Sequence, residues 1–205
     1  MRFSHVLLFA AAAVGCNAVD RGEASQSNAA DSSAFASNAA EGAVESMEAM
    51  LERFQNGSPR VDSLSDVSAS AQALTRRYLE AVERFDTTTL RDIHISRAEY
   101  AHLYFPSSTM MAPPYELPPD VAWMLHTSES NKGIASVLRR FGGQRLEFEA
   151  VRCPGEPLRE VRNTVWRECL VRYRAPGAPP REQPLFAAII ERDGRFKFFS
   201  YATSL

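Results

Sequence analysis

The chain has 205 residues, a formal net charge of −2 and 45% hydrophobic residues. That length suits one globular domain with a tail, and the near-neutral charge gives no reason to expect a nucleic-acid partner. The sequence contains no CxxC, HxxxH or HExxH spacing, no glycine-rich phosphate loop and no GxSxG motif. We therefore expect no metal site and no cofactor, and no motif identifies a catalytic residue.

The N-terminus has the three parts of an export signal. Arg2 supplies a positive charge, residues 6–14 form an uninterrupted apolar run, and Ala13-Val14-Gly15-Cys16 ends the run with small residues. The apolar run is far shorter than the roughly 20 residues that a helix needs to cross a bilayer. The pattern therefore predicts a signal peptide over residues 1–15.

The segment Ala13-Val14-Gly15-Cys16 resembles the lipobox of bacterial lipoproteins, in which the cysteine is acylated and becomes the new N-terminus. The resemblance implies that Cys16 is lipidated. It also implies an exported protein of the bacterial cell envelope, anchored in a membrane at the periplasmic face or the outer surface. The alternative is an ordinary signal peptidase that cuts nearby, for instance after Ala18, and leaves a secreted protein without an anchor.

Composition divides the rest of the chain. Residues 16–40 are dominated by Ala, Ser, Asn, Asp, Glu and Gly, with Phe35 as the only large apolar residue. Such a stretch buries too little apolar surface to offset its ordering entropy, so it is predicted to be a flexible tether. Residues 41–69 are predicted to form a helix and a loop that precede the domain, and residues 70–205 to form an α+β domain.

Apolar spacing predicts the helices. Apolar residues recur three and four positions apart over 42–55 and 67–85, which indicates an amphipathic helix in each range. Asp86 has the chemistry of an N-cap for a short helix over 87–93. Ser96 and Glu99 have the spacing of a capping box, which predicts a further turn or two through Tyr104.

The last predicted helix has prolines before it and glycines after it. Residues 106–119 contain five prolines and are predicted to form a stiff, irregular crossing loop. Helical spacing resumes over 120–141, with a bend expected at Gly133, and Gly142-Gly143 ends the helix.

After Gly143 the pattern changes to strands, over 145–153, 165–174, 184–192 and the C-terminal run after Gly194. Asp193-Gly194 is a type I′ turn sequence, which sets Arg192 opposite Arg195 and Ile189 opposite Phe198. Helices followed by antiparallel strands make an α+β order.

The order of these elements over residues 70–205 resembles the nuclear transport factor 2-like family, which has a cone-shaped fold. The resemblance implies N-terminal helices packed on a curved antiparallel sheet of about four or more strands, with a pocket inside the cone. A cystatin-like or another helix-on-sheet arrangement would give the same order of elements.

Cys153 and Cys169 lie in neighbouring predicted strands, 16 residues apart. If those strands form a hairpin centred near Val161, the two side chains face each other, and the oxidising compartment of an exported protein favours a disulfide. Two free, buried thiols are the alternative.

The densest polar and aromatic group is Glu99, Tyr100, His102 and Tyr104. In the cone fold this segment would lie at the mouth of the pocket. Alternatively, Glu99 caps a helix, His102 faces water and the tyrosines belong to the core. The candidate ligand-pocket residues are Tyr100, Tyr104, Trp123, His126 and Tyr201.

These features favour a lipid-anchored envelope protein that binds a small apolar ligand or another envelope protein, or acts as a scaffold, without catalysis. The alternative is a small-molecule enzyme of the cone-fold type. Members of that superfamily such as ketosteroid isomerase and scytalone dehydratase place acid–base groups in the pocket, but no residue here matches a motif of theirs.

Overall fold

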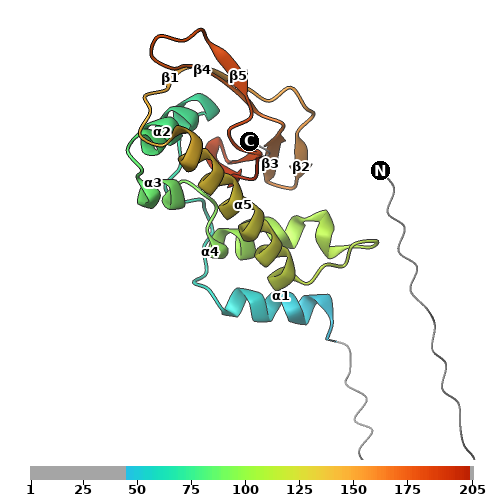
Figure 1. The fold of residues 1–205 in the computed structure, drawn as a ribbon. Helices are drawn as coiled ribbons and strands as arrows, with labels where there is room; N and C mark the ends of the chain where they lie inside the picture. Colours follow the sequence, from blue (N-terminus) through green and yellow to red (C-terminus); the bar gives the residue numbers. More distant parts are fainter. Residues whose placement is uncertain (1–44, 204–205) are drawn as a thin grey trace, which may run out of the picture. The chain divides into compact units, whose positions relative to one another are not determined.

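The computed structural model describes residues 45–203, in which helices are followed by antiparallel strands (Figure 1). The α+β prediction is confirmed. The predicted signal peptide, Cys16 and the tether lie outside the described residues. Over the described range no helix is both long enough and apolar enough to span a membrane.

Polar side chains cap the first four helices of the described range. Ser46, Ser70, Asp86 and Ser96 each accept a hydrogen bond from a backbone N–H of the first turn, and Ser96 forms the predicted capping box with Glu99. The helices are α1 (Met47–Asn56), α2 (Ala71–Glu83), α3 (Thr87–Asp92) and α4 (Arg97–Glu99).

The segment after α4 begins with the predicted further turn through Tyr104 and continues into the predicted irregular loop over 106–119. It contains a π-helical turn and two short 3₁₀ turns, which are η1 (Tyr100–Tyr104), η2 (Phe105–Ser107) and η3 (Thr109–Met111). The long helix α5 (Pro119–Phe141) follows and ends at Gly142. Figure 1 shows α5 crossing the domain in front of the other elements.

Gly133 has a different role from the predicted bend. Helix α5 continues through it, and a Cβ added at this position would overlap the backbone carbonyl of Tyr201 and also contact Ala202. Because Gly133 has no side chain, the backbone of the C-terminal segment can pass directly against the backbone of the helix.

Gly133→Ala tests this close approach. Helix propensity alone predicts a gain of about 1 kcal/mol, but we expect a net loss of about 2 kcal/mol because the backbone of Tyr201 must move. Thermal and chemical unfolding measure the change, with Lys132→Ala on the exposed side of the same turn as the control. An unchanged or raised melting temperature for Gly133→Ala would contradict the close approach.

The seven strands within residues 45–203 form two antiparallel sheets. The first has the order β1-β4-β5, with β1 (Glu147–Arg152), β4 (Leu170–Arg174) and β5 (Arg181–Gln183). The second has the order β2-β3-β6-β7, with β2 (Leu158–Glu160), β3 (Asn163–Arg167), β6 (Ala188–Arg192) and β7 (Arg195–Ser200).

The prediction of one curved sheet is therefore wrong. The predicted strand over 165–174 breaks at Glu168, which has a φ of 57°, in the left-handed region. The residues before this corner pair with β2 and β6, whereas those after it pair with β1 and β5. Arg167 and Glu168 interrupt the apolar pattern at the corner, but two charged residues within a strand-like run do not by themselves indicate a change of sheet.

The terminal hairpin is confirmed, including its register. Arg192 pairs with Arg195 and Ile189 with Phe198. Asp193 has a φ of 53° and Gly194 a φ of 72°, as a type I′ turn requires.

Gly194→Val is expected to destabilise the domain by about 1–2 kcal/mol, because a β-branched residue is strained at this positive φ. No heavy atom lies within 4 Å of a Cβ built here, so the loss would come from the backbone and not from a clash. Equilibrium unfolding measures it, with Arg195→Val as the neighbouring control. Equal stability of the two variants would contradict the strained turn.

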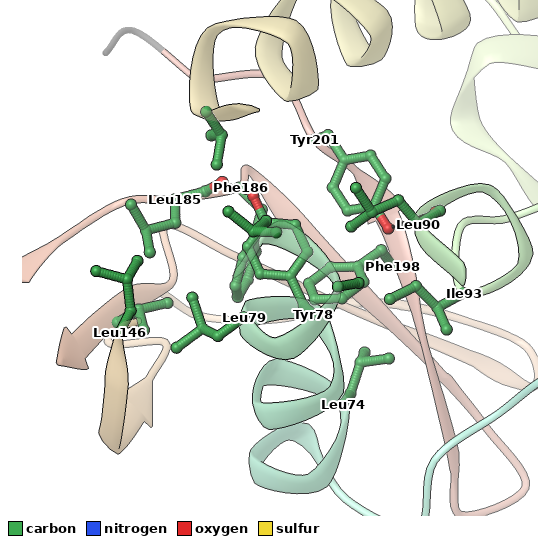
Figure 2. Packing of buried hydrophobic residues seen from close by; sticks show 14 of the residues in the cluster. Leu74, Tyr78, Leu79, Leu90, Ile93, Leu146, Leu185, Phe186, Phe198 and Tyr201 are labelled. Atoms are coloured by element: carbon green, nitrogen blue, oxygen red, sulfur yellow. Dashed lines mark hydrogen bonds between the residues drawn. The ribbon is translucent and has the colours of Figure 1, made fainter. Parts of the chain in front are cut away.

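The core lies between the helices and the sheets. Figure 2 shows Tyr78 of α2 packed against Phe198 of β7, with Phe186 and Tyr201 around them. The two buried hydroxyls are satisfied, because Tyr78 donates to the Leu185 carbonyl and Tyr201 donates to the Leu90 carbonyl.

A second cluster surrounds Tyr100, which is 1% exposed. Phe54 of α1 packs edge-on against it, and Leu64 is buried in the same cluster. Helix α1 and the loop after it therefore contribute to the core of the described region.

The Cys153–Cys169 disulfide is confirmed, but the predicted route is wrong. Strand β1 pairs with β4, and the pair Arg152–Leu170 brings the adjacent cysteines together. The hairpin that turns at Val161 joins β2 to β3 and is inserted between the two cysteines. In the chain-entropy model, a disulfide that closes a loop of this length stabilises the folded state by roughly 3 kcal/mol.

Candidate functional site

A cavity of about 920 Å³ lies between sheet β2-β3-β6-β7 and the segment from η1 to α5. The sheet contributes apolar side chains such as Leu158, Val165 and Ala188. Tyr104 and Phe199, whose ring centroids are 4.5 Å apart, also line the cavity. Charged groups are present at Arg167 and Glu168, which are both exposed. A mostly apolar wall with a few polar groups is the usual composition of a small-molecule site.

The predicted pocket residues are divided among different places. Tyr104 and His126 line the large cavity, Tyr201 lines a second cavity of about 360 Å³, and Trp123 lines a third of about 440 Å³. Tyr100 lines none of these three and belongs to the core. All five nevertheless lie close together, because Tyr100 contacts Tyr104, Trp123 and His126, and His94 joins His126 to Tyr201.

His126 is a polar group at the apolar wall. Its Nε2 is buried and has no hydrogen-bond partner among residues 45–203. Burial lowers the pKa of His126 to about 4, although a hydrogen bond with the Phe199 backbone acts in the opposite direction. The ring is therefore neutral at pH 7.

Sequence reasoning missed a contact between a hydroxyl and an imidazole in the second cavity. Ser130 Oγ lies 2.8 Å from His94 Nε2, and His94 Nδ1 lies 2.9 Å from the Ile95 carbonyl oxygen. The same Ser130 oxygen accepts the backbone N–H of Tyr201 at 2.8 Å. Burial and then the neighbouring His126 lower the pKa of His94 to about 3.

Ser130 and His94 are residue types that can form a nucleophile–base pair, but their surroundings are those of a buried structural hydrogen bond. Ser130 is 2% exposed, and its oxygen is occupied by both the imidazole and the Tyr201 N–H. A base with a pKa near 3 accepts a proton poorly at neutral pH. The pair therefore holds the C-terminal segment against α5.

Glu99 is neutralised inside the core by Lys197 of β7. Lys197 Nζ lies 2.9 and 2.8 Å from the two carboxylate oxygens, and Ser65 and Ser96 donate their backbone N–H groups. Burial alone would raise the pKa of Glu99, but these hydrogen bonds outweigh it and hold the pKa below its usual range. Glu99 is not among the residues that line the three cavities.

His102 and Glu160 have buried polar atoms without partners. The Nε2 atom of His102 is enclosed, so the expectation that this residue faces water does not hold for that atom. Glu160 is 6% exposed, and neither of its carboxylate oxygens has a hydrogen-bond partner in the described part of the chain. No motif in the sequence distinguishes Glu160 from the other acidic residues of the strands.

Within residues 45–203 no group of three or more His, Cys, Asp or Glu side chains is placed to hold a metal ion. Comparison of the chain with protein-family models, with curated proteins and with solved structures finds no match.

Proposed function

We propose that this chain is a lipid-anchored protein of the bacterial envelope whose domain binds a small apolar ligand without catalysis. The observation that carries the proposal is the cavity of about 920 Å³ lined by Tyr104, Leu158, Val165 and Phe199. This volume lies within the range of small-molecule sites in other proteins, and the cavity is open to solvent on the side of Tyr115 and Arg167.

The anchor part of the proposal rests on the N-terminal sequence, in which a short apolar run ends at Cys16. The expected mature protein begins with an acylated Cys16, which intact-mass analysis of detergent-extracted protein measures. Cys16→Ser should abolish the lipid mass and the membrane association. A mature chain that begins after Cys16 would overturn the anchor.

The family assignment is a separate part of the proposal. The order of helices before strands supports a relation to the nuclear transport factor 2-like family, but the two open sheets do not reproduce the single curved sheet of a cone. The cavity supports ligand binding whether or not that relation holds.

Binding is tested with octan-1-ol as the probe, in competition with the neutral fluorophore diphenylhexatriene. We expect saturable displacement by the wild-type chain. Ala187→Trp should weaken binding at least tenfold, because Ala187 lines the cavity and an indole would fill part of it. Thermal melting shows whether the variant is folded.

Ala178→Trp is the matched control, because Ala178 lies in the turn between β4 and β5 and lines none of the three cavities. It should bind the probe as the wild type does. The proposal fails if the wild type does not bind, or if both tryptophan variants bind equally well.

One contact favours the alternative, a small-molecule enzyme. Ser130 and His94 lie at hydrogen-bond distance beside the second cavity. If this pair is catalytic, a fluorophosphonate probe should label Ser130 in the wild type and not in Ser130→Ala. Because Ser130 is enclosed and His94 is a weak base, we expect no labelling of the folded chain.

A further inference from the structure

Arg167 is an unpaired cation in the wall of the large apolar cavity. It is exposed, and within residues 45–203 its guanidinium group takes part in no hydrogen bond and no ion pair. The arginines of the neighbouring sheet differ in this respect, because Arg152, Arg172 and Arg174 each donate to a glutamate at 2.8 or 2.9 Å. The guanidinium group of Arg167 can therefore bind an anion without breaking an existing pair.

The register of the sheet places Arg167 on the face that forms the cavity wall. Residues two apart in a strand share a face, so Arg167 follows Val165 of β3 on the same side. Arg167 pairs with Ala188 of β6, and both Val165 and Ala188 line the cavity. Trp166 lies on the opposite face, where its Nε1 donates to Glu191. The guanidinium group therefore continues the apolar wall formed by β3 and β6.

Arg167 also lies at the open side of the cavity. Arg167 and Tyr115, which is 68% exposed, line that side, whereas Val165 and Phe186 are buried. Burial raises the pKa of Tyr104 to about 12, and the charge of Arg167 acts in the opposite direction, so the guanidinium group lies near that hydroxyl. The cavity therefore has an apolar interior, and a cation lies at its opening.

Two carboxyl groups near Arg167 would disfavour an anion, but neither is placed as Arg167 is. Glu168 lines the cavity, yet its Oε2 lies only 3.2 Å from a Cβ built on Gly155, in the loop between β1 and β2. The carboxylate of Glu168 is therefore turned toward that loop. Glu160 lines none of the three cavities. Arg167 is the charged group best placed to contact the polar end of a ligand whose apolar part fills the cavity.

We propose that the ligand of this cavity is an apolar molecule with a carboxylate at one end, and that Arg167 binds the carboxylate. This inference rests on the proposed function, because it names the chemical class of ligand for the same cavity. The planar guanidinium group donates two parallel N–H groups, which match the two oxygens of a carboxylate. A single cation with acidic groups nearby also favours a singly charged head group over a phosphate monoester.

Three probes with the same alkyl tail test the inference on the whole chain: octanoate, octan-1-ol and octylamine. We expect octanoate to bind about fivefold more tightly than octan-1-ol, which is the upper end of what an exposed ion pair contributes, and octylamine to bind most weakly. Raising the salt concentration from about 0.05 M to about 0.5 M should narrow the preference for octanoate, because the ion pair is exposed to screening.

Replacing Arg167 tests its role directly. In Arg167→Gln the preference for octanoate should disappear while binding of octan-1-ol is unchanged. Arg159→Gln is the matched control, because Arg159 is an exposed arginine of the same sheet that lines none of the three cavities. It removes the same charge from the chain and should retain the preference. Glu168→Gln should retain it as well.

The outcomes separate the two proposals. If octan-1-ol does not bind to the wild type, the proposed function fails. If octan-1-ol binds but octanoate binds no more tightly, or if Arg167→Gln keeps the preference, the role of Arg167 is overturned. An equal loss of preference in Arg159→Gln would also overturn it, as would a preference for octylamine that is lost in Glu168→Gln. The ranking of the three probes on the wild type decides the ligand class even if Arg167→Gln does not fold.

Discussion

Replacing Lys197 with methionine is expected to lower the free energy of unfolding by about 3–5 kcal/mol at pH 7. Lys197 is 1% exposed, and its ammonium group pairs with both oxygens of the equally buried Glu99. Methionine retains the apolar stem but leaves the carboxylate uncompensated in the core. The remaining hydrogen bonds from Ser65 and Ser96 do not neutralise its charge.

The chain offers a matched control in Lys132, the only other lysine. Its Nζ lies 2.7 Å from Glu129, but the two side chains are 69% and 61% exposed. Lys132→Met should therefore change the stability by less than about 0.5 kcal/mol. In the double variant Glu99→Leu with Lys197→Met, much of the loss should be recovered because no buried charge is left unpaired. A small effect of Lys197→Met, equal to that of Lys132→Met, would contradict the buried pair.

Acidification from pH 8 to pH 5 is expected to lower the free energy of unfolding by on the order of 3 kcal/mol through two neighbouring histidines. The rings of His94 and His126 lie 5.6 Å apart, and burial lowers their pKa values to about 3 and about 4. In the unfolded chain an ordinary histidine has a pKa near 6.5. The unfolded state therefore takes up protons first, so stability is complete above about pH 6.5 and is lost as the pH falls toward the folded values.

Chemical unfolding at a series of pH values measures this slope. The double variant His94→Gln with His126→Leu should have a flatter profile between pH 6.5 and pH 5, whatever its stability at pH 8. Glu99 adds a separate loss, because its lowered pKa places that contribution below the ordinary glutamate range. A wild-type profile that is flat above pH 5 would contradict the assignment to the histidines.

Features that depend on neighbours along the chain could be predicted from the sequence alone. Asp86 caps its helix because the acceptor and the N–H of Thr89 are three residues apart. Ser96 and Glu99 form a capping box for the same reason. Asp193-Gly194 sets the register of the last hairpin because few other pairs adopt positive φ at both positions.

Contacts between segments that are distant in the sequence could not be predicted in this way and are seen only in the folded chain. Glu168 divides the single predicted strand into β3 and β4, which belong to different sheets. The pairing of β1 with β4, and not a local hairpin, brings Cys153 close to Cys169. The residues next to Lys197 in the sequence predict a strand position that faces solvent. Lys197 is nevertheless buried, because its ammonium group pairs with Glu99, which is 98 positions away in the sequence. His126 of α5 likewise lines one cavity together with Leu158 and Val165 of the distant strands β2 and β3. Such encounters are set by the packing of whole elements, and periodicity within one segment carries no information about them.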